Sequence, residues 1–243
     1  MKAEELVAAT AKHVEKLFAG EGSGHDWWHI KRVWQNALMI GRQEKADLTI
    51  VQLGALLHDI ADWKFHAGDE EAGPKAARQW LLSLDAPEEL IERVCQIVKE
   101  VTFKGAGVDT TPTSLEAQVV QDADRLDAIG AIGIGRAFAY GGHKGREMYH
   151  PGQEPQLHAS FEEYKKNQSP TLNHFYEKLF LLKDRLNTRT GQQMAQERHA
   201  YMQNFVERFL LEWHGEELPP AAFRLQEPAS SQIAAAYNPS ASA

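Results

Sequence analysis

The sequence predicts an all-α fold, and three features support this prediction. Apolar residues recur at helical spacing along most of the chain, whereas the alternation typical of strands is nearly absent. Proline and small polar residues stand where helices are expected to begin, and glycines stand where some of them are expected to end. Residues 51–57 are apolar on almost every side, which is typical of a helix inside a bundle. We therefore expect a single helical bundle with a central buried helix.

The first half of the chain contains five expected helices. The first has its apolar residues at positions 6, 7, 14, 17 and 18, and a Gly-Ser-Gly run at 22–24 follows it. Asp47 or Thr49 can cap the third helix, and Pro74 and Pro87 suit the first turns of the fourth and fifth. The expected ranges are about 6–18, 27–42, 50–62, 74–84 and 87–101.

The second half contains three longer expected helices. Thr113 followed three residues later by Glu116 is typical of a capping box, and the helix that it opens should run to Tyr140. Further helices should cover about 170–186 and 192–213, while 143–160 should form a loop. We expect one domain over residues 1–215 and a disordered tail over 216–243, which is rich in Pro, Ala and Ser.

Composition excludes some partners. The 243 residues include 26 Lys and Arg against 34 Asp and Glu, which leaves a net charge of −8. This charge argues against duplex nucleic acid and anionic membranes as partners, but it permits a small phosphate-bearing substrate in a local basic pocket. With a single cysteine, Cys95, and neither a signal peptide nor a membrane span in view, we expect a cytoplasmic protein. Whether it forms oligomers stays open.

Histidines and acids stand in three of the apolar helices. His58 and Asp59 are adjacent near the end of the most apolar helix, and His29 lies on the buried edge of the preceding one. A later segment, 119–127, contains three acids among apolar residues, so at least one of them must point inward. Burying such groups is costly unless a partner or a metal compensates. Two imidazoles and two carboxylates would suit Mn²⁺, Fe²⁺, Co²⁺, Ni²⁺ or Zn²⁺.

The order and spacing of these residues resemble the HD-domain superfamily of metal-dependent phosphohydrolases, whose signature is H…HD…D. The segments 25–33 and 56–60 are similar to the first two blocks of that superfamily. The segment 121–130 is similar to its bacterial YpgQ/YedJ branch. The resemblance covers about residues 10–215, and it implies the same all-α fold.

The resemblance implies that His29, His58, Asp59 and Asp124 bind one divalent metal ion. We expect Mn²⁺ first, with Mg²⁺, Co²⁺, Ni²⁺, Fe²⁺ or Zn²⁺ as alternatives. Periodicity alone does not choose among the three acids at 122, 124 and 127, and the family pattern, an aspartate between Ala and Arg-Leu, selects Asp124. His25 stays an alternative to His29, because it stands four residues earlier and could face the same way.

Two acids are expected to do chemistry beside the metal. Asp62 stands three residues after Asp59, within one helical turn, so both can reach the same cavity. In related guanosine-tetraphosphate hydrolases an acid at this offset helps the attacking water, which implies a catalytic role for Asp62 together with Asp59. The alternative is that Asp62 is a surface acid at a helix end.

Phosphate groups would also need cations from the protein. Each candidate has an ordinary alternative, such as pairing with helix carbonyls, pairing with an acid, or facing solvent. The candidates for substrate binding are Lys64, Lys104, Arg125 and Lys178.

The resemblance implies hydrolysis of (deoxy)nucleoside triphosphates to monophosphate and pyrophosphate by a metal-activated water. The superfamily also contains nucleotide phosphomonoesterases and cyclic-nucleotide phosphodiesterases, so the bond that is cleaved stays open. The alternative from a different class is a non-catalytic helical module that keeps the HD core for regulation. Metal content would separate them, since a scaffold would be purified without stoichiometric transition metal.

Overall fold

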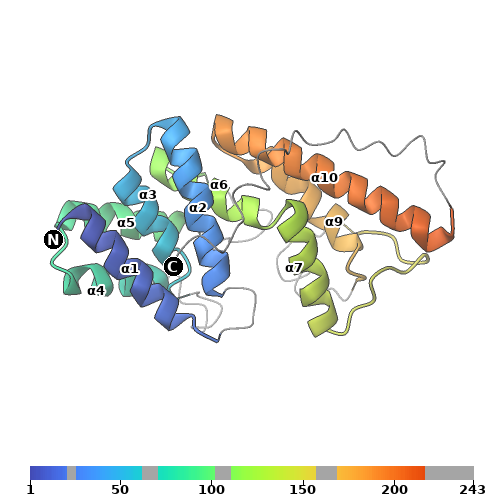
Figure 1. The fold of residues 1–243 in the computed structure, drawn as a ribbon, viewed down its shortest axis with the longest axis horizontal. Coiled ribbons are helices and arrows are strands. Elements are labelled where there is room, and N and C mark those ends of the chain that lie inside the picture. The colour runs from blue at the N-terminus through green and yellow to red at the C-terminus, as the bar shows by residue number, and fades with distance from the viewer. Residues whose placement is uncertain (21–25, 62–70, 102–110, 157–168, 217–243) are drawn as a thin grey trace, which may run out of the picture. The chain divides into compact units, whose positions relative to one another are not determined.

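The computed structural model describes residues 1–20, 26–61, 71–101, 111–156 and 169–216, and every regular element in these ranges is helical (Figure 1). The all-α prediction is confirmed. The elements are α1 (Ala3–Leu17), α2 (Trp27–Glu44), α3 (Leu48–Leu57), α4 (Ala72–Ser83), α5 (Glu88–Val101), α6 (Leu115–Asp127), α7 (Gly130–His143), α9 (Asn173–Glu177), the 3₁₀ helix η2 (Leu179–Arg185) and α10 (Arg189–His214).

The chain divides into two compact units, residues 1–203 and 204–243. The second unit begins with the last turns of α10, where the rings of Phe205, Phe209 and Trp213 follow one another along the helix. Residues 217–243, which contain most of the expected tail, lie outside the described residues. Within the described ranges no helix is both long enough and apolar enough to cross a membrane.

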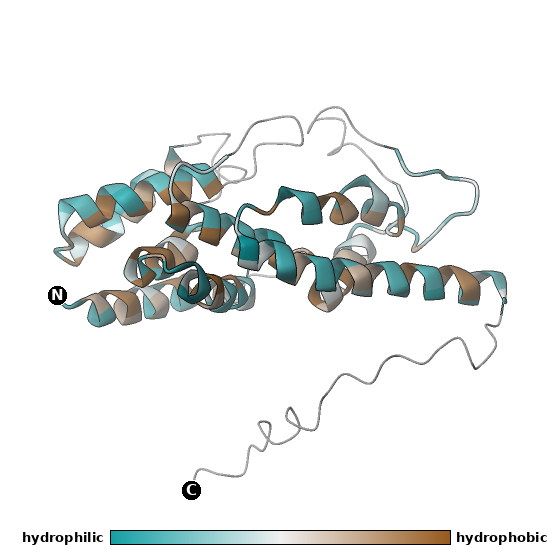
Figure 2. Ribbon diagram, turned by 90° about the horizontal axis from the view of Figure 1, so that it is seen from above, coloured by the Kyte–Doolittle hydropathy of each residue, from teal (hydrophilic) through white to brown (hydrophobic). Residues whose placement is uncertain are grey.

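The central buried helix is α3, as predicted. It packs against α1, α2, α5 and α6, and Val51, Leu53 and residues 55–57 are inaccessible to solvent. Gly54 allows α5 to approach, because a Cβ there would lie 2.9 Å from Cγ2 of Ile97. The neighbouring helices are amphipathic, with hydrophobic and hydrophilic residues on different sides (Figure 2).

The ends of α3 differ in how well the sequence predicts them. At the start, the Asp47 side chain accepts hydrogen bonds from the backbone N–H groups of Thr49 and Ile50, as a cap should. At the end, the predicted continuation to residue 62 is wrong, because the α-helix stops at Leu57. There the N–H of Ile60 donates to the Leu57 carbonyl three residues back, which tightens the chain into a turn.

The single helix predicted from Thr113 to Tyr140 is also wrong, since α6 and α7 are separate. Ile129 is extended and Gly130 has a φ of +76°, a conformation that favours glycine. Arg198 of α10 packs against this break: a Cβ on Gly130 would lie 3.0 Å from its Cγ, and its guanidinium donates to the Leu126 carbonyl. The break is therefore held by a tertiary contact.

The predicted capping box at the start of α6 is wrong as well. Ser114 is the N-cap, and its hydroxyl accepts from the N–H of Ala117 at 3.1 Å. Thr113 instead donates to Glu100 on α5, and Glu116 accepts from the N–H of Asp47. The side chains of Thr113 and Glu116 therefore form hydrogen bonds with other elements and do not form a capping box.

The segment after Pro170 is less regular than the helix predicted there. It consists of α9 and η2, and Lys178 separates them with a non-helical φ of −143°. The last helix begins at Arg189, three residues before the predicted start, because Thr188 caps it through a hydrogen bond from the N–H of Gly191.

Candidate metal centre

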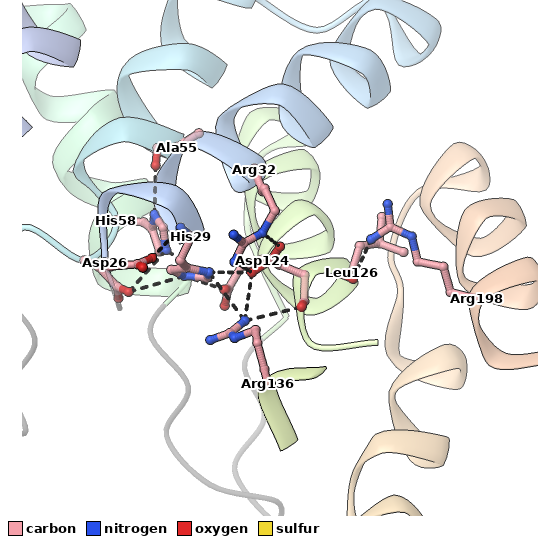
Figure 3. A network of polar contacts seen from close by, with 11 residues as sticks. Asp26, His29, Arg32, Ala55, His58, Asp124, Leu126, Arg136 and Arg198 are labelled. Atoms are coloured by element: carbon pink, nitrogen blue, oxygen red, sulfur yellow. Dashed lines mark hydrogen bonds and ion pairs between the residues drawn. The ribbon is translucent and has the colours of Figure 1, made fainter. Parts of the chain in front are cut away.

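Four of the predicted ligands meet where the start of α2, the end of α3 and the last turn of α6 come together (Figure 3). Nε2 of His29 lies 3.6 Å from Oδ2 of Asp59 and 3.5 Å from Oδ1 of Asp124. Nε2 of His58 lies 3.5 Å and 4.0 Å from the same two oxygens. Atoms that each bind one ion at about 2.0–2.2 Å stand at most about 4.4 Å apart. The distances from the two ring nitrogens to these oxygens are therefore compatible with a shared ion, and the ligand atoms of His29, His58 and Asp59 all lie within 4.8 Å of one another.

The histidines are held so that one nitrogen of each faces this centre. Nδ1 of His58 lies 2.8 Å from the Ala55 carbonyl, and because a carbonyl only accepts, Nδ1 must carry the hydrogen. The lone pair of the neutral ring is then on Nε2. Among the described residues this buried Nε2 has no hydrogen-bond partner. A buried nitrogen left in this way is costly, and a metal ion is the ligand that would satisfy it.

His29 is oriented by Asp127. Its Nδ1 lies 2.7 Å from Oδ2 of Asp127, so the N–H of the ring points at this carboxylate and Nε2 points at Asp59 and Asp124. Histidine ligands commonly donate their other N–H to a carboxylate in this way. The backbone N–H of His29 also donates to Asp26, the N-cap of α2, at 2.8 Å.

The electrostatic surroundings favour a cation at Nε2 of His29. Burial by itself would lower the pKa of this ring, but hydrogen bonds to Asp127 and Asp59 and the charge of Asp124 raise it to about 9. A metal ion at the same position would experience the same negative surroundings.

Asp127 is the hub of a network that the sequence did not predict. Its side chain is only 2% exposed and accepts hydrogen bonds from His29, from Arg32 at 2.7 and 3.0 Å, and from Arg136 at 2.8 Å. Burial would raise its pKa, but the hydrogen bonds from His29 and Arg32 and the charge of Arg136 hold it well below the usual range. The available signal was its position three residues after Asp124, on the same face of α6.

Asp122 lies in a different network. It is fully buried, and it accepts hydrogen bonds from the backbone and side-chain donors of Asn187 and Thr188 at 2.7–2.8 Å. Gly191 is needed there, because a Cβ at that position would collide with the carboxylate. Asp122 therefore joins α6 to the start of α10, whereas Asp124 lies beside the two histidines.

Of the remaining predicted site residues, Arg125 and Lys178 lie in the described ranges, and the charge of Asp124 acts on Arg125. Asp62, Lys64, Lys104 and the alternative ligand His25 lie outside the described residues. Arg125 donates to the carbonyl of Arg185. Lys178 lies between α9 and η2, where its charge acts on His174.

A family model and a known bacterial protein match this chain. The family model described as HD domain matches residues 27–129, a range that includes all four predicted ligands. The Bacillus subtilis protein YpgQ is 40% identical over 194 residues, which are 79% of this chain and 86% of that protein.

Solved structures give the same result. An HD-superfamily hydrolase from Bacillus thuringiensis is 42% identical, with a TM-score of 0.70, and the match covers 88% of this chain and 99% of that chain. The structure of Bacillus subtilis YpgQ in complex with ADP has 33% identity and a TM-score of 0.68, and the match covers 87% of this chain and 100% of that chain.

Proposed function

The chain belongs to the HD-domain family of hydrolases, and from this premise we propose that it is a divalent-metal-dependent phosphohydrolase acting on nucleotides. The observation that supports this most is the convergence of His29, His58, Asp59 and Asp124 with a ring nitrogen of each histidine directed at the two carboxylates. The ADP bound to the related YpgQ supports a nucleotide as the ligand. Our specific proposal is cleavage of (deoxy)nucleoside triphosphates to monophosphate and pyrophosphate.

The four converging side chains would hold one metal ion. A divalent ion bound there supplies a Lewis acid for a phosphoryl oxygen and lowers the pKa of a water molecule. Two imidazole nitrogens and two carboxylate oxygens form a mixed set that favours Mn²⁺, Fe²⁺, Co²⁺, Ni²⁺ or Zn²⁺ over the all-oxygen preference of Mg²⁺. Among these we propose Mn²⁺.

The chain's own groups would prepare the site before any substrate arrives. The Ala55 carbonyl and the Asp127 carboxylate fix the ring orientation of His58 and His29, so no reorientation is needed on metal binding. Asp62, three residues after Asp59, is proposed as the group that accepts a proton from the attacking water or returns one to the leaving oxygen.

A nucleotide panel tests the proposal. Protein loaded with Mn²⁺ is incubated with nucleoside mono-, di- and triphosphates and with cyclic nucleotides, and the products are separated as phosphate and pyrophosphate. We expect pyrophosphate from triphosphates, and its loss in the presence of a chelator. Release of inorganic phosphate from nucleoside monophosphates would replace the proposed activity by phosphomonoester hydrolysis. Absence of stoichiometric metal together with no turnover would indicate a non-catalytic module, and bound metal without turnover would contradict a nucleotide substrate.

The metal site has its own control. His58→Ala and Asp59→Ala should lose stoichiometric metal while keeping their helical circular dichroism, because the ligands belong to a core that is already packed. Retention of metal at wild-type affinity by either variant would contradict the proposed centre.

A further inference from the structure

Two arginines that the sequence did not single out share one buried carboxylate beside the candidate centre. Arg32 of α2 holds Asp127 with two atoms, Nε to Oδ1 at 2.7 Å and Nη2 to Oδ2 at 3.0 Å. Arg136 of α7 reaches the same Oδ2 with Nη1 at 2.8 Å. Oδ2 also lies 2.7 Å from Nδ1 of His29, so the carboxylate links both guanidinium groups to a predicted metal ligand, and Nη1 of Arg136 lies 3.5 Å from that ring nitrogen (Figure 3).

The two guanidinium groups are partly accessible to solvent, unlike the residues that they hold. Asp127 and His29 are 2% and 1% exposed, whereas Arg32 and Arg136 are 31% and 30% exposed. Asp124, the most accessible predicted ligand, is 32% exposed. The two guanidinium groups and the Asp124 carboxylate are therefore accessible to solvent to a similar extent, whereas the shared anchor Asp127 is buried.

Part of the Arg32 guanidinium group faces away from this anchor. The charge of Asp26 also acts on Arg32, and the Asp26 side chain caps the N–H of His29. Asp127 occupies the Nε and Nη2 edge of Arg32, which leaves Nη1 on the side turned away from that carboxylate.

From this geometry we propose that Arg32 and Arg136 bind the phosphate groups of the nucleotide at the metal centre. The inference rests on the proposed function, and it names the cations that this function requires. The planar guanidinium group matches the oxygens of a phosphate, and Asp127 holds both groups in place before the ligand arrives. Arg125, one of the four cations that the sequence suggested for this role, donates to the Arg185 carbonyl.

Calorimetric titration of the Mn²⁺-loaded protein with ADP tests the inference without turnover. Arg32→Gln and Arg136→Gln should each weaken ADP binding roughly ten- to a hundredfold, the range for removing a charge-assisted hydrogen bond or two. Their affinity for Mn²⁺, titrated separately, should stay within a few-fold of wild type. Arg136→Lys should recover part of the ADP affinity because it keeps the charge, and it serves as the test if Arg136→Gln does not fold.

The matched control is Arg42→Gln. Arg42 is exposed and lies ten residues beyond Arg32 in α2, about 15 Å along the helix axis, so ADP binding should not change. Wild-type ADP affinity in metal-loaded Arg32→Gln and Arg136→Gln would overturn the inference. Loss of Mn²⁺ in the glutamine variants would overturn it too, because the arginines would then act only through Asp127. If the wild type binds ADP but hydrolyses no nucleotide, the proposed function fails while the comparison of variants still decides the inference.

Discussion

Replacing Asp127 by Asn changes one buried side chain while keeping its size. In the wild type Oδ2 accepts from His29, Arg32 and Arg136, and Oδ1 accepts from Arg32. An amide has one oxygen and one NH₂ group, so at least one of these donors would face another donor. If the NH₂ group faced His29, the ring could accept at Nδ1 only by moving its hydrogen to Nε2, where it would block metal binding.

The magnitude follows from the burial of the network. Removing one partner of a fully buried ion pair costs about 3–5 kcal/mol of stability, because it leaves a charge uncompensated. The two arginines are about 30% exposed, so water compensates part of this loss, and we expect a decrease of about 2–3 kcal/mol. For a domain of this size, that lowers the Tm by roughly 5–10 °C. Loss of the carboxylate behind a metal-binding histidine should weaken metal affinity about 10- to 100-fold.

Two measurements check this prediction. Thermal unfolding followed by circular dichroism gives the Tm of the metal-free protein, and calorimetric titration with Mn²⁺ gives the affinity. The control is Asp184→Asn, since Asp184 on η2 is 75% exposed and should change neither quantity. A folded Asp127→Asn protein that binds Mn²⁺ as tightly as wild type would refute the role given to Asp127.

Three further predictions concern single residues. Asp124→Asn should lose metal binding and keep its Tm. Asp122→Asn should keep metal binding and melt at a lower temperature, because it weakens the hydrogen bonds at the start of α10. Calorimetry and melting curves that show the reverse would exclude Asp124 as the ligand. Asp62→Asn should bind metal normally but lose about two orders of magnitude in kcat with a smaller change in KM, and full single-turnover activity would rule out its catalytic role. Burial, together with the charge of Lys178, lowers the pKa of His174 to about 3. In the unfolded chain this ring takes up a proton near pH 6.5. The free energy of unfolding should therefore decrease as the pH falls from 6.5 toward 3, by at most about 1.4 kcal/mol per pH unit. Urea unfolding of His174→Gln should show a flatter pH dependence, and an unchanged slope would contradict the assignment.

The helices could be predicted because their periodicity and many of their ends are local properties of the chain. Asp47 caps α3 through the backbone of the next three residues, so the sequence shows it directly. Predictions failed where a distant group competed with a local signal. Glu100 binds Thr113, which leaves Ser114 as the cap of α6, and Arg198 packs on the break at Gly130. Neither partner can be recognised from the local sequence.

In the candidate centre, too, some features follow from the local sequence and others from the packing of distant elements. Helical spacing and the cost of burying charge indicated that His29, His58 and Asp59 would need a compensating partner, and the family pattern predicted Asp124 as the fourth ligand. The roles of the other two acids in α6 depend on which elements pack against that helix. His29 of α2 lies beside Asp127, 98 residues away in the sequence. Thr188, at the start of α10, lies beside Asp122, 66 residues away. All three acids lie in one helix, so the periodicity of that helix does not distinguish their roles. Their hydrogen-bond and ion-pair partners distinguish them, and those partners become neighbours only when the helices pack.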